Sequence, residues 1–171
     1  HGGVQLPDGT VAAVKRDCDA LEQLSRLARE TYGLAGAVQH GASTLNAEAF
    51  EAFPRAGACE IHLATNFQSI VFDHPALPAA LRKEMYDWLD ANAESERKPG
   101  DTPEQFYYKA RKKAIGPFKR DLWSLPAGVR EAIGADLEKT FGFLFDQLKV
   151  NGTAALVAKY VQAPYQSHAS L

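Results

Sequence analysis

Several residue types are scarce in this chain of 171 residues, and each scarcity argues against a class of protein. Two cysteines are too few for a disulfide framework, which predicts a reduced, cytoplasmic setting. The formal net charge is only −2 at pH 7, so no basic face and no nucleic-acid partner are expected. No apolar run approaches the roughly 20 residues of a membrane span, so no membrane partner is expected either.

The composition is that of a globular domain, with 46% hydrophobic and 23% charged residues. Residues 19–32 predict a helix that Gly33 ends. Asp19 and Glu22 have the spacing of a capping box, and the apolar residues recur with helical period. The stripe expected to be buried consists of Leu21, Leu24, Leu27 and Ala28.

Two later segments predict β-strands. "LAGAVQ" (34–39) is short and apolar, which is typical of a strand buried on both faces, and "CEIHLAT" (59–65) alternates between apolar and polar residues. A short helix is expected between them, and this order predicts an α/β arrangement with parallel strands. The rest reads as helical, with helices over 78–93, 102–115 and 126–149.

Polar residues follow each predicted strand. His40-Gly41 follows the first strand, at the carboxyl end where parallel sheets place catalytic groups. His1 is also followed by glycine, so the two histidines are candidate metal ligands, although a lone histidine at a strand end is more often structural or merely exposed. Thr65 and Asn66 open the next helix, where backbone N–H groups favour an anion or where either side chain serves as a simple cap.

Four motifs occur together in one order. They are "HGG" at residues 1–3, "QHGAST" at 39–44, "EIHLATNFQ" at 60–68 and "YYKAR" at 107–111. In this order and spacing they resemble the second half of a class II, zinc-dependent fructose-bisphosphate aldolase. That family folds as a (β/α)8 TIM barrel. The resemblance therefore implies that residues 1–75 are the last βα units of such a barrel and residues 76–171 a helical C-terminal extension.

The resemblance also implies a site. Zn2+ is the expected cofactor, with His1 and His40 as two of its three ligands and room for a monovalent cation nearby. No catalytic residue is expected in this chain, because the family's aspartate base and third zinc histidine lie in the missing N-terminal half, which becomes an expected partner. A sugar phosphate is the expected substrate, and the residues implied to bind it are Gly2, Gly41, Ala42, Ser43, His62, Leu63, Ala64, Thr65 and Arg111.

Arg111 matches an arginine that reaches a neighbouring subunit's site in that family, so the resemblance implies a homo-oligomer. Without the resemblance, the basic run from Lys109 to Lys113 is typical of a solvated helix face. Two positions depart from the family pattern: His62 stands where the family has asparagine, and Ala64 where it has aspartate.

The departures keep two other functions open. One is a catalytically lapsed aldolase-like protein that serves as a binding or oligomerisation module. The other is a copper site formed by an N-terminal histidine with His40 or His62, which the helical sequence makes the weaker alternative. The leading expectation is zinc-dependent cleavage of fructose 1,6-bisphosphate to dihydroxyacetone phosphate and glyceraldehyde 3-phosphate.

Overall fold

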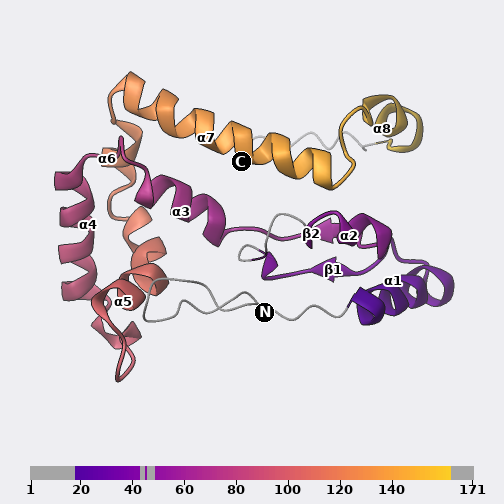
Figure 1. The fold of residues 1–171 in the computed structure, drawn as a ribbon, viewed down its shortest axis with the longest axis horizontal. Coiled ribbons are helices and arrows are strands. Elements are labelled where there is room, and N and C mark those ends of the chain that lie inside the picture. The colour runs from indigo at the N-terminus through magenta and orange to yellow at the C-terminus, as the bar shows by residue number, and fades with distance from the viewer. Residues whose placement is uncertain (1–17, 43–44, 46–48, 163–171) are drawn as a thin grey trace, which may run out of the picture.

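The computed structural model describes residues 18–42, 45 and 49–162. Most of these residues are helical, and two short strands form one sheet (Figure 1). In chain order the elements are α1 (Cys18–Tyr32), β1 (Val38–Gln39), α2 (Ala52–Arg55), β2 (Glu60–Ile61), α3 (Thr65–Asp73), α4 (Ala79–Asn92), the 3-10 helix η3 (Glu94–Glu96), α5 (Pro103–Ala110), the 3-10 helix η4 (Arg111–Ile115), α6 (Lys119–Trp123), α7 (Ala127–Gln147) and α8 (Ala154–Tyr160).

The sheet corrects the predicted fold class. β1 and β2 pair in parallel, which confirms that part of the prediction, with Val38 opposite Glu60 and Gln39 opposite Ile61. Each strand is only two residues long, and this pair is the whole sheet within the described residues. The expected C-terminal part of a (β/α)8 barrel is therefore wrong, and the described part of the chain is a mostly helical domain.

Two glycines explain why the first strand is so short. Gly36 has a φ of 149°, and a Cβ there would lie 2.7 Å from the carbonyl oxygen of Gly57. Arg29 Nη1 donates to that same carbonyl oxygen at 2.8 Å. This close crossing interrupts extended backbone, so the ladder begins only at Val38. Val38 is 42% exposed, which shows that the prediction of a strand buried on both faces is wrong.

Helix α1 forms where the sequence predicts it, but its apolar stripe is buried only in part: Leu21 packs against the cluster around Phe53, and Leu21 and Ala28 are half-buried. Leu24 is 57% exposed and Leu27 48% exposed. The fully buried residue of the helix is Ser25, whose hydroxyl accepts a hydrogen bond from the backbone N–H of Ala37 at 3.4 Å. The apolar period thus predicts the helix correctly and its buried face only in part.

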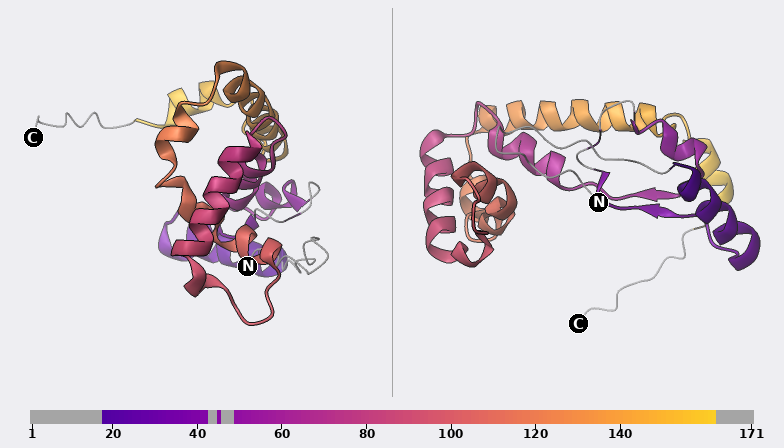
Figure 2. Two further views of the ribbon diagram at one scale, coloured as in Figure 1. Left: turned by 90° about the vertical axis from the view of Figure 1, so that its left-hand side faces the viewer. Right: turned by 60° about the horizontal axis from the view of Figure 1, so that its bottom comes forward.

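The main core lies at the opposite end of the molecule from α1, around α4 and α5 (Figures 1 and 2). Met85, Leu89 and Phe106 are completely buried there. Helices bury such side chains because each removes apolar surface from water, which stabilises by about 1.5–3 kcal/mol per large side chain. The other buried members of this cluster are Phe72, Ala93, Ala110 and Ala114.

The start of α5 follows the sequence prediction in detail. Thr102 Oγ1 accepts from the backbone N–H of Gln105 at 3.2 Å, and Gln105 Oε1 accepts from the backbone N–H of Thr102 at 3.1 Å. Pro103 occupies the first helical position. This reciprocal capping box satisfies two donors that the helix cannot satisfy itself. Asp19, by contrast, lies within the first turn of α1.

Helix α7 links the two ends of the molecule (Figure 2). Near its start, Ile133 packs with Leu77 and Leu125, and near its end Leu144 packs with Phe50 and Phe53. One helix therefore belongs to two apolar clusters. Neither α7 nor any other helix in the described part of the chain is both long and apolar enough to cross a membrane.

Candidate functional site

Two histidines meet at the carboxyl ends of the paired strands. His40 directly follows β1, and His62 directly follows β2. The backbone N–H of His62 donates to the carbonyl oxygen of Gln39 at 2.9 Å, which extends the ladder by one bond and aligns the two residues. Their ring centroids are 4.3 Å apart with the planes tilted by 42°. The parallel register therefore places two imidazoles side by side.

Glu60 completes this cluster. Its Oε1 contacts Nε2 of His62, two residues along the same strand and on the same face. Sequence reasoning missed Glu60 because it lies before the end of the strand. The signal that could have found it is strand period, since residues two apart share a face. The side chains of Glu60 and His62 are 59% and 48% exposed, so water and ions reach the cluster.

The residues predicted to bind phosphate lie next to the histidines. Gly41 has a φ of 71°, a left-handed conformation that glycine adopts without strain, and Ala42 is completely buried. Leu63 packs against the apolar cluster around Phe53, and its side chain therefore points away from the histidine cluster.

The chain then enters α3 within three residues of His62. Ala64 is the N-cap and brings no side-chain hydrogen bond to the helix start. Thr65 is the first residue of α3, and the backbone N–H groups of its first turn lie beyond the reach of any intrahelical acceptor. The first turn of α3 thus follows the histidine cluster directly in the chain.

Arg111 lies elsewhere, in η4, and contacts the C-terminal part of α3. Its Nη1 donates to Asp73 Oδ1 at 2.7 Å, and its Nη2 donates to Ser69 Oγ at 2.7 Å. The residue is only 3% exposed, and the guanidinium lies 5.3 Å from the ring centre of Phe72. The structure thus places Arg111 inside this chain as a tie between η4 and α3, and does not bring it to the histidines.

Three of the predicted site residues lie outside the described residues. They are His1, Gly2 and Ser43. Within the described residues no group of three His, Cys, Asp or Glu side chains is arranged to hold a metal ion. Imidazole nitrogen is nevertheless a preferred zinc donor, so His40 and His62 fit zinc in kind, and they supply two of the three protein ligands of a usual catalytic site.

A third histidine has a different environment. His74 is 8% exposed, and its Nδ1 accepts from the backbone N–H of Ala76 at 3.0 Å. Its Nε2 lies 3.5 Å from Asp136 Oδ2 on α7. With both ring nitrogens engaged, His74 caps the turn after α3 and is unsuited to bind a metal.

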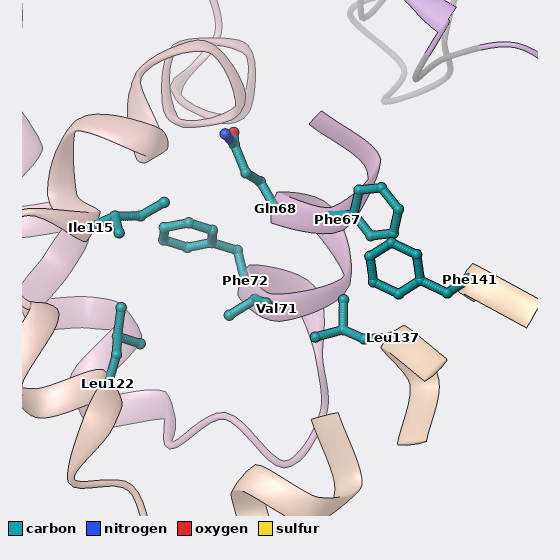
Figure 3. Close-up of a pocket in the computed structure, with 8 residues that line it drawn as sticks. All are labelled: Phe67, Gln68, Val71, Phe72, Ile115, Leu122, Leu137 and Phe141. Carbon is teal, nitrogen blue, oxygen red and sulfur yellow. The ribbon is translucent and has the colours of Figure 1, made fainter. Parts of the chain in front are cut away.

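A separate cavity of about 440 Å³ lies between α3 and the later helices (Figure 3). Phe67 and Phe141 stack on one side of it with ring centres 4.6 Å apart, and Ile115 and Leu122 lie on the other side. Gln68 is the one polar side chain among the lining residues. The cavity is thus a hydrophobic hollow without groups for acid–base or metal chemistry.

The clearest shifted pKa in the described residues belongs to the helical end of the molecule. Tyr107 donates to Asp90 Oδ2 at 2.8 Å, and this hydrogen bond, with burial as a smaller cause, raises the pKa of Tyr107 to about 12. The pKa of Asp101 is lowered, mainly because Lys109 donates a hydrogen bond to it. Both groups belong to surface networks that hold α5 in place.

Comparison with known proteins adds no relative to these observations. No protein-family model matches the chain, and neither the curated proteins nor the solved structures contain a match.

Proposed function

We propose that this chain carries part of the site of a zinc-dependent aldolase that cleaves a ketose bisphosphate, with fructose 1,6-bisphosphate as the expected substrate. The observation that carries the proposal is the pairing of His40 with His62 at the carboxyl ends of two parallel strands, immediately before α3. The motif resemblance, from "QHGAST" to "EIHLATNFQ", supports the same reaction.

In this proposal His40 is a zinc ligand, and His1 is a second one expected from the sequence. Bound zinc would supply Lewis-acid polarisation of the substrate ketone. Its ligands must be neutral imidazoles, and a position exposed to solvent lets both the ion and the substrate reach the site.

In this proposal, the backbone around Gly41 and at the start of α3 binds the phosphate group of the substrate. The left-handed Gly41 permits a close approach of backbone to ligand, and the first turn of α3 offers N–H groups and the positive end of the helix dipole. Ala64 favours this use because a methyl group does not compete for those donors. The methyl also removes the carboxylate acceptor of the family pattern, which changes the contacts to substrate hydroxyls.

The proton transfer requires a base from outside this chain. Aldol cleavage must move a proton from a substrate hydroxyl, and the carboxylate beside the site, Glu60, already contacts His62. The proposal therefore keeps the expectation that the base and a further zinc ligand come from the polypeptide that precedes this chain.

The test is an aldol-cleavage assay with fructose 1,6-bisphosphate and zinc. The 171-residue chain alone is expected to give no turnover, and the protein extended by its preceding segment is expected to be active. His40→Ala in the extended protein should abolish turnover. Turnover by the 171 residues alone, or full activity of the His40→Ala variant, would contradict the proposal.

A second candidate function, a non-catalytic oligomerisation module, is favoured by the exposed apolar side chains. Leu24 and Leu27 on α1 are about half exposed, as are Leu156 and Val157 on α8. Surfaces of this kind mark interaction sites when they are contiguous. Light scattering of the wild-type chain and of Leu24→Glu/Leu27→Glu distinguishes the candidates. A self-association lost in the variant, with an inactive extended protein, would favour the module.

A further inference from the structure

The contact between Glu60 and His62 determines which ring nitrogen of His62 can bind a ligand. Glu60 Oε1 contacts Nε2, and a carboxylate accepts a hydrogen bond, so the proton of the neutral ring is held at Nε2. The lone pair is then on Nδ1. A carboxylate that fixes the tautomer of a histidine in this way is a recurring partner of metal-ligating histidines, because it orients the ring and raises its basicity.

The second candidate ligand is the neighbouring ring of His40. Two imidazoles that share one tetrahedral zinc, with bonds of about 2.0–2.1 Å, have ring centres roughly 5 Å apart. The rings of His40 and His62 are 4.3 Å apart, so a relative movement of less than about 1 Å would bring them to that spacing. The backbone bond from His62 N–H to Gln39 carbonyl oxygen at 2.9 Å keeps the two residues in register during such a movement.

We propose that His62 is itself a metal ligand. Its Nδ1 and a ring nitrogen of His40 bind one Zn2+ ion, and Glu60 is the positioning residue that holds the ring of His62 through Nε2. The remaining coordination positions are filled by water or by donors beyond the described residues. The choice of zinc as the resident ion rests on the proposed function. The assignment of His62 goes beyond that function, because the resemblance gives this position to substrate.

The proposal predicts a measurable metal site in the unmodified 171-residue chain. Co2+ replaces zinc and gives visible absorption bands on binding to imidazoles, so titration with Co2+, followed by displacement with Zn2+, reports stoichiometry and affinity. We expect one ion per chain. His62→Ala should weaken binding by at least about tenfold, and Glu60→Gln by about 10–100-fold, the usual effect of removing the partner of a ligating histidine.

Matched variants control for changes in charge and for unfolding. Glu84→Gln on the exposed face of α4 removes a carboxylate, as Glu60→Gln does. His168→Ala near the C-terminus removes an imidazole, as His62→Ala does. Both control variants should leave binding of the ion unchanged. Circular dichroism of each variant reports whether the helices are intact. His62→Gln keeps a polar side chain of similar size and should lose the ion as His62→Ala does.

Nitrogen NMR of the imidazoles identifies the ligating atom directly. Addition of Zn2+ should shift the Nδ1 resonance of His62, while Nε2 keeps its proton toward Glu60. A shift at Nε2, or no shift in either nitrogen of His62, would overturn the proposal even if every variant folds.

The outcomes separate this inference from the proposed function. Co2+ binding that is lost in His40→Ala but unchanged in His62→Ala overturns the role of His62 and leaves the aldolase proposal standing. Binding that needs both histidines, in an extended protein without aldol-cleavage activity, supports the metal pair and refutes the reaction.

Discussion

Two regions of this molecule differ in how they are held together. The strand region, residues 18–42 and 49–64, leaves Leu24, Leu27 and Val38 between 42% and 57% exposed. The helical region, residues 79–123, buries Met85 and Phe106 completely. The candidate chemistry is in the first region, and the larger cluster of buried side chains lies around the second.

The difference indicates a division of roles between the regions. Segments that bind ligands are commonly less stable than the core that supports them. Here the supporting core is connected to the candidate site through α3, which begins at Thr65 beside the histidines and ends at Asp73 beside Arg111. The predictions below test whether stability and chemistry are divided between the regions in this way.

The largest effect is expected in the helical core. Phe106→Ala removes a completely buried ring and should lower the free energy of unfolding by about 3–5 kcal/mol, whereas Leu24→Ala on α1 should lower it by less than about 1 kcal/mol. Urea denaturation followed by circular dichroism measures both values. Equal losses of unfolding free energy in the two variants would show that α1 is covered in solution. They would contradict the difference between the two regions.

The tie between η4 and α3 should respond differently to the loss of each partner. Asp73→Ala leaves the guanidinium of Arg111, 3% exposed, without its carboxylate and should destabilise by about 2 kcal/mol. Arg111→Met replaces the buried charge by an apolar chain and returns Asp73, 61% exposed, to water, so it should cost less than about 1 kcal/mol. The same urea titrations compare the two variants.

Arg111→Met also tests the role that the resemblance implies. In the extended protein, an Arg111 that binds the second phosphate would give a raised KM for the bisphosphate on substitution. An unchanged KM would assign Arg111 to the tie alone.

Substitution of a glycine by alanine should change stability with opposite signs in the strand region and in α7. Gly36→Ala places a Cβ 2.7 Å from a carbonyl oxygen at a φ of 149° and should destabilise by about 1–3 kcal/mol. Gly134→Ala within α7 meets no atom within 4 Å and should stabilise by about 0.5–1 kcal/mol, because alanine loses less backbone entropy in a helix. Thermal unfolding midpoints should therefore move in opposite directions. A fall in both would show that α7 needs its glycine.

The smallest effect concerns the titration of Tyr107. Its pKa of about 12 in the folded chain lies above the usual value of 10, so this contribution to stability is fully present below pH 10 and is lost as the pH rises toward 12. Ultraviolet difference spectra at high pH should report the ionisation of Tyr107 above the usual range. Asp90→Asn should lower the pKa of Tyr107 by removing the carboxylate, and an unchanged late titration would contradict this cause.

The helices could be predicted because their signals are local. Thr102 and Gln105 form the expected capping box, and α4 and α7 lie within a residue or two of the predicted ranges. The strand lengths could not be predicted, because they depend on the contact between Gly36 and Gly57, 21 residues apart in the sequence. The prediction of which α1 residues are buried also depends on distant segments, because the helical period does not say what covers Leu24.

The candidate site was predictable only in part. His40 and His62 are predictable as residues at strand ends, and the order of elements predicts that the two strands run parallel, but their register is seen only in the structure. Strand period places Glu60 and His62 on one face, but the contact between the two side chains depends on their rotamers, which the sequence does not fix. The sequence resemblance predicts that Arg111 binds substrate. Its bonds to Ser69 and Asp73 could not be predicted, because they arise from the tertiary packing of η4 on α3.

The length of α7 has a consequence for the motions of the whole molecule. Its 21 residues span about 32 Å, with Ile133 in one apolar cluster and Leu144 in another. Neither cluster can open fully while the helix stays packed at both ends. Backbone amides in the middle of α7 should therefore exchange with solvent deuterium only when both ends detach, which makes this helix the slowest-exchanging segment between the two regions.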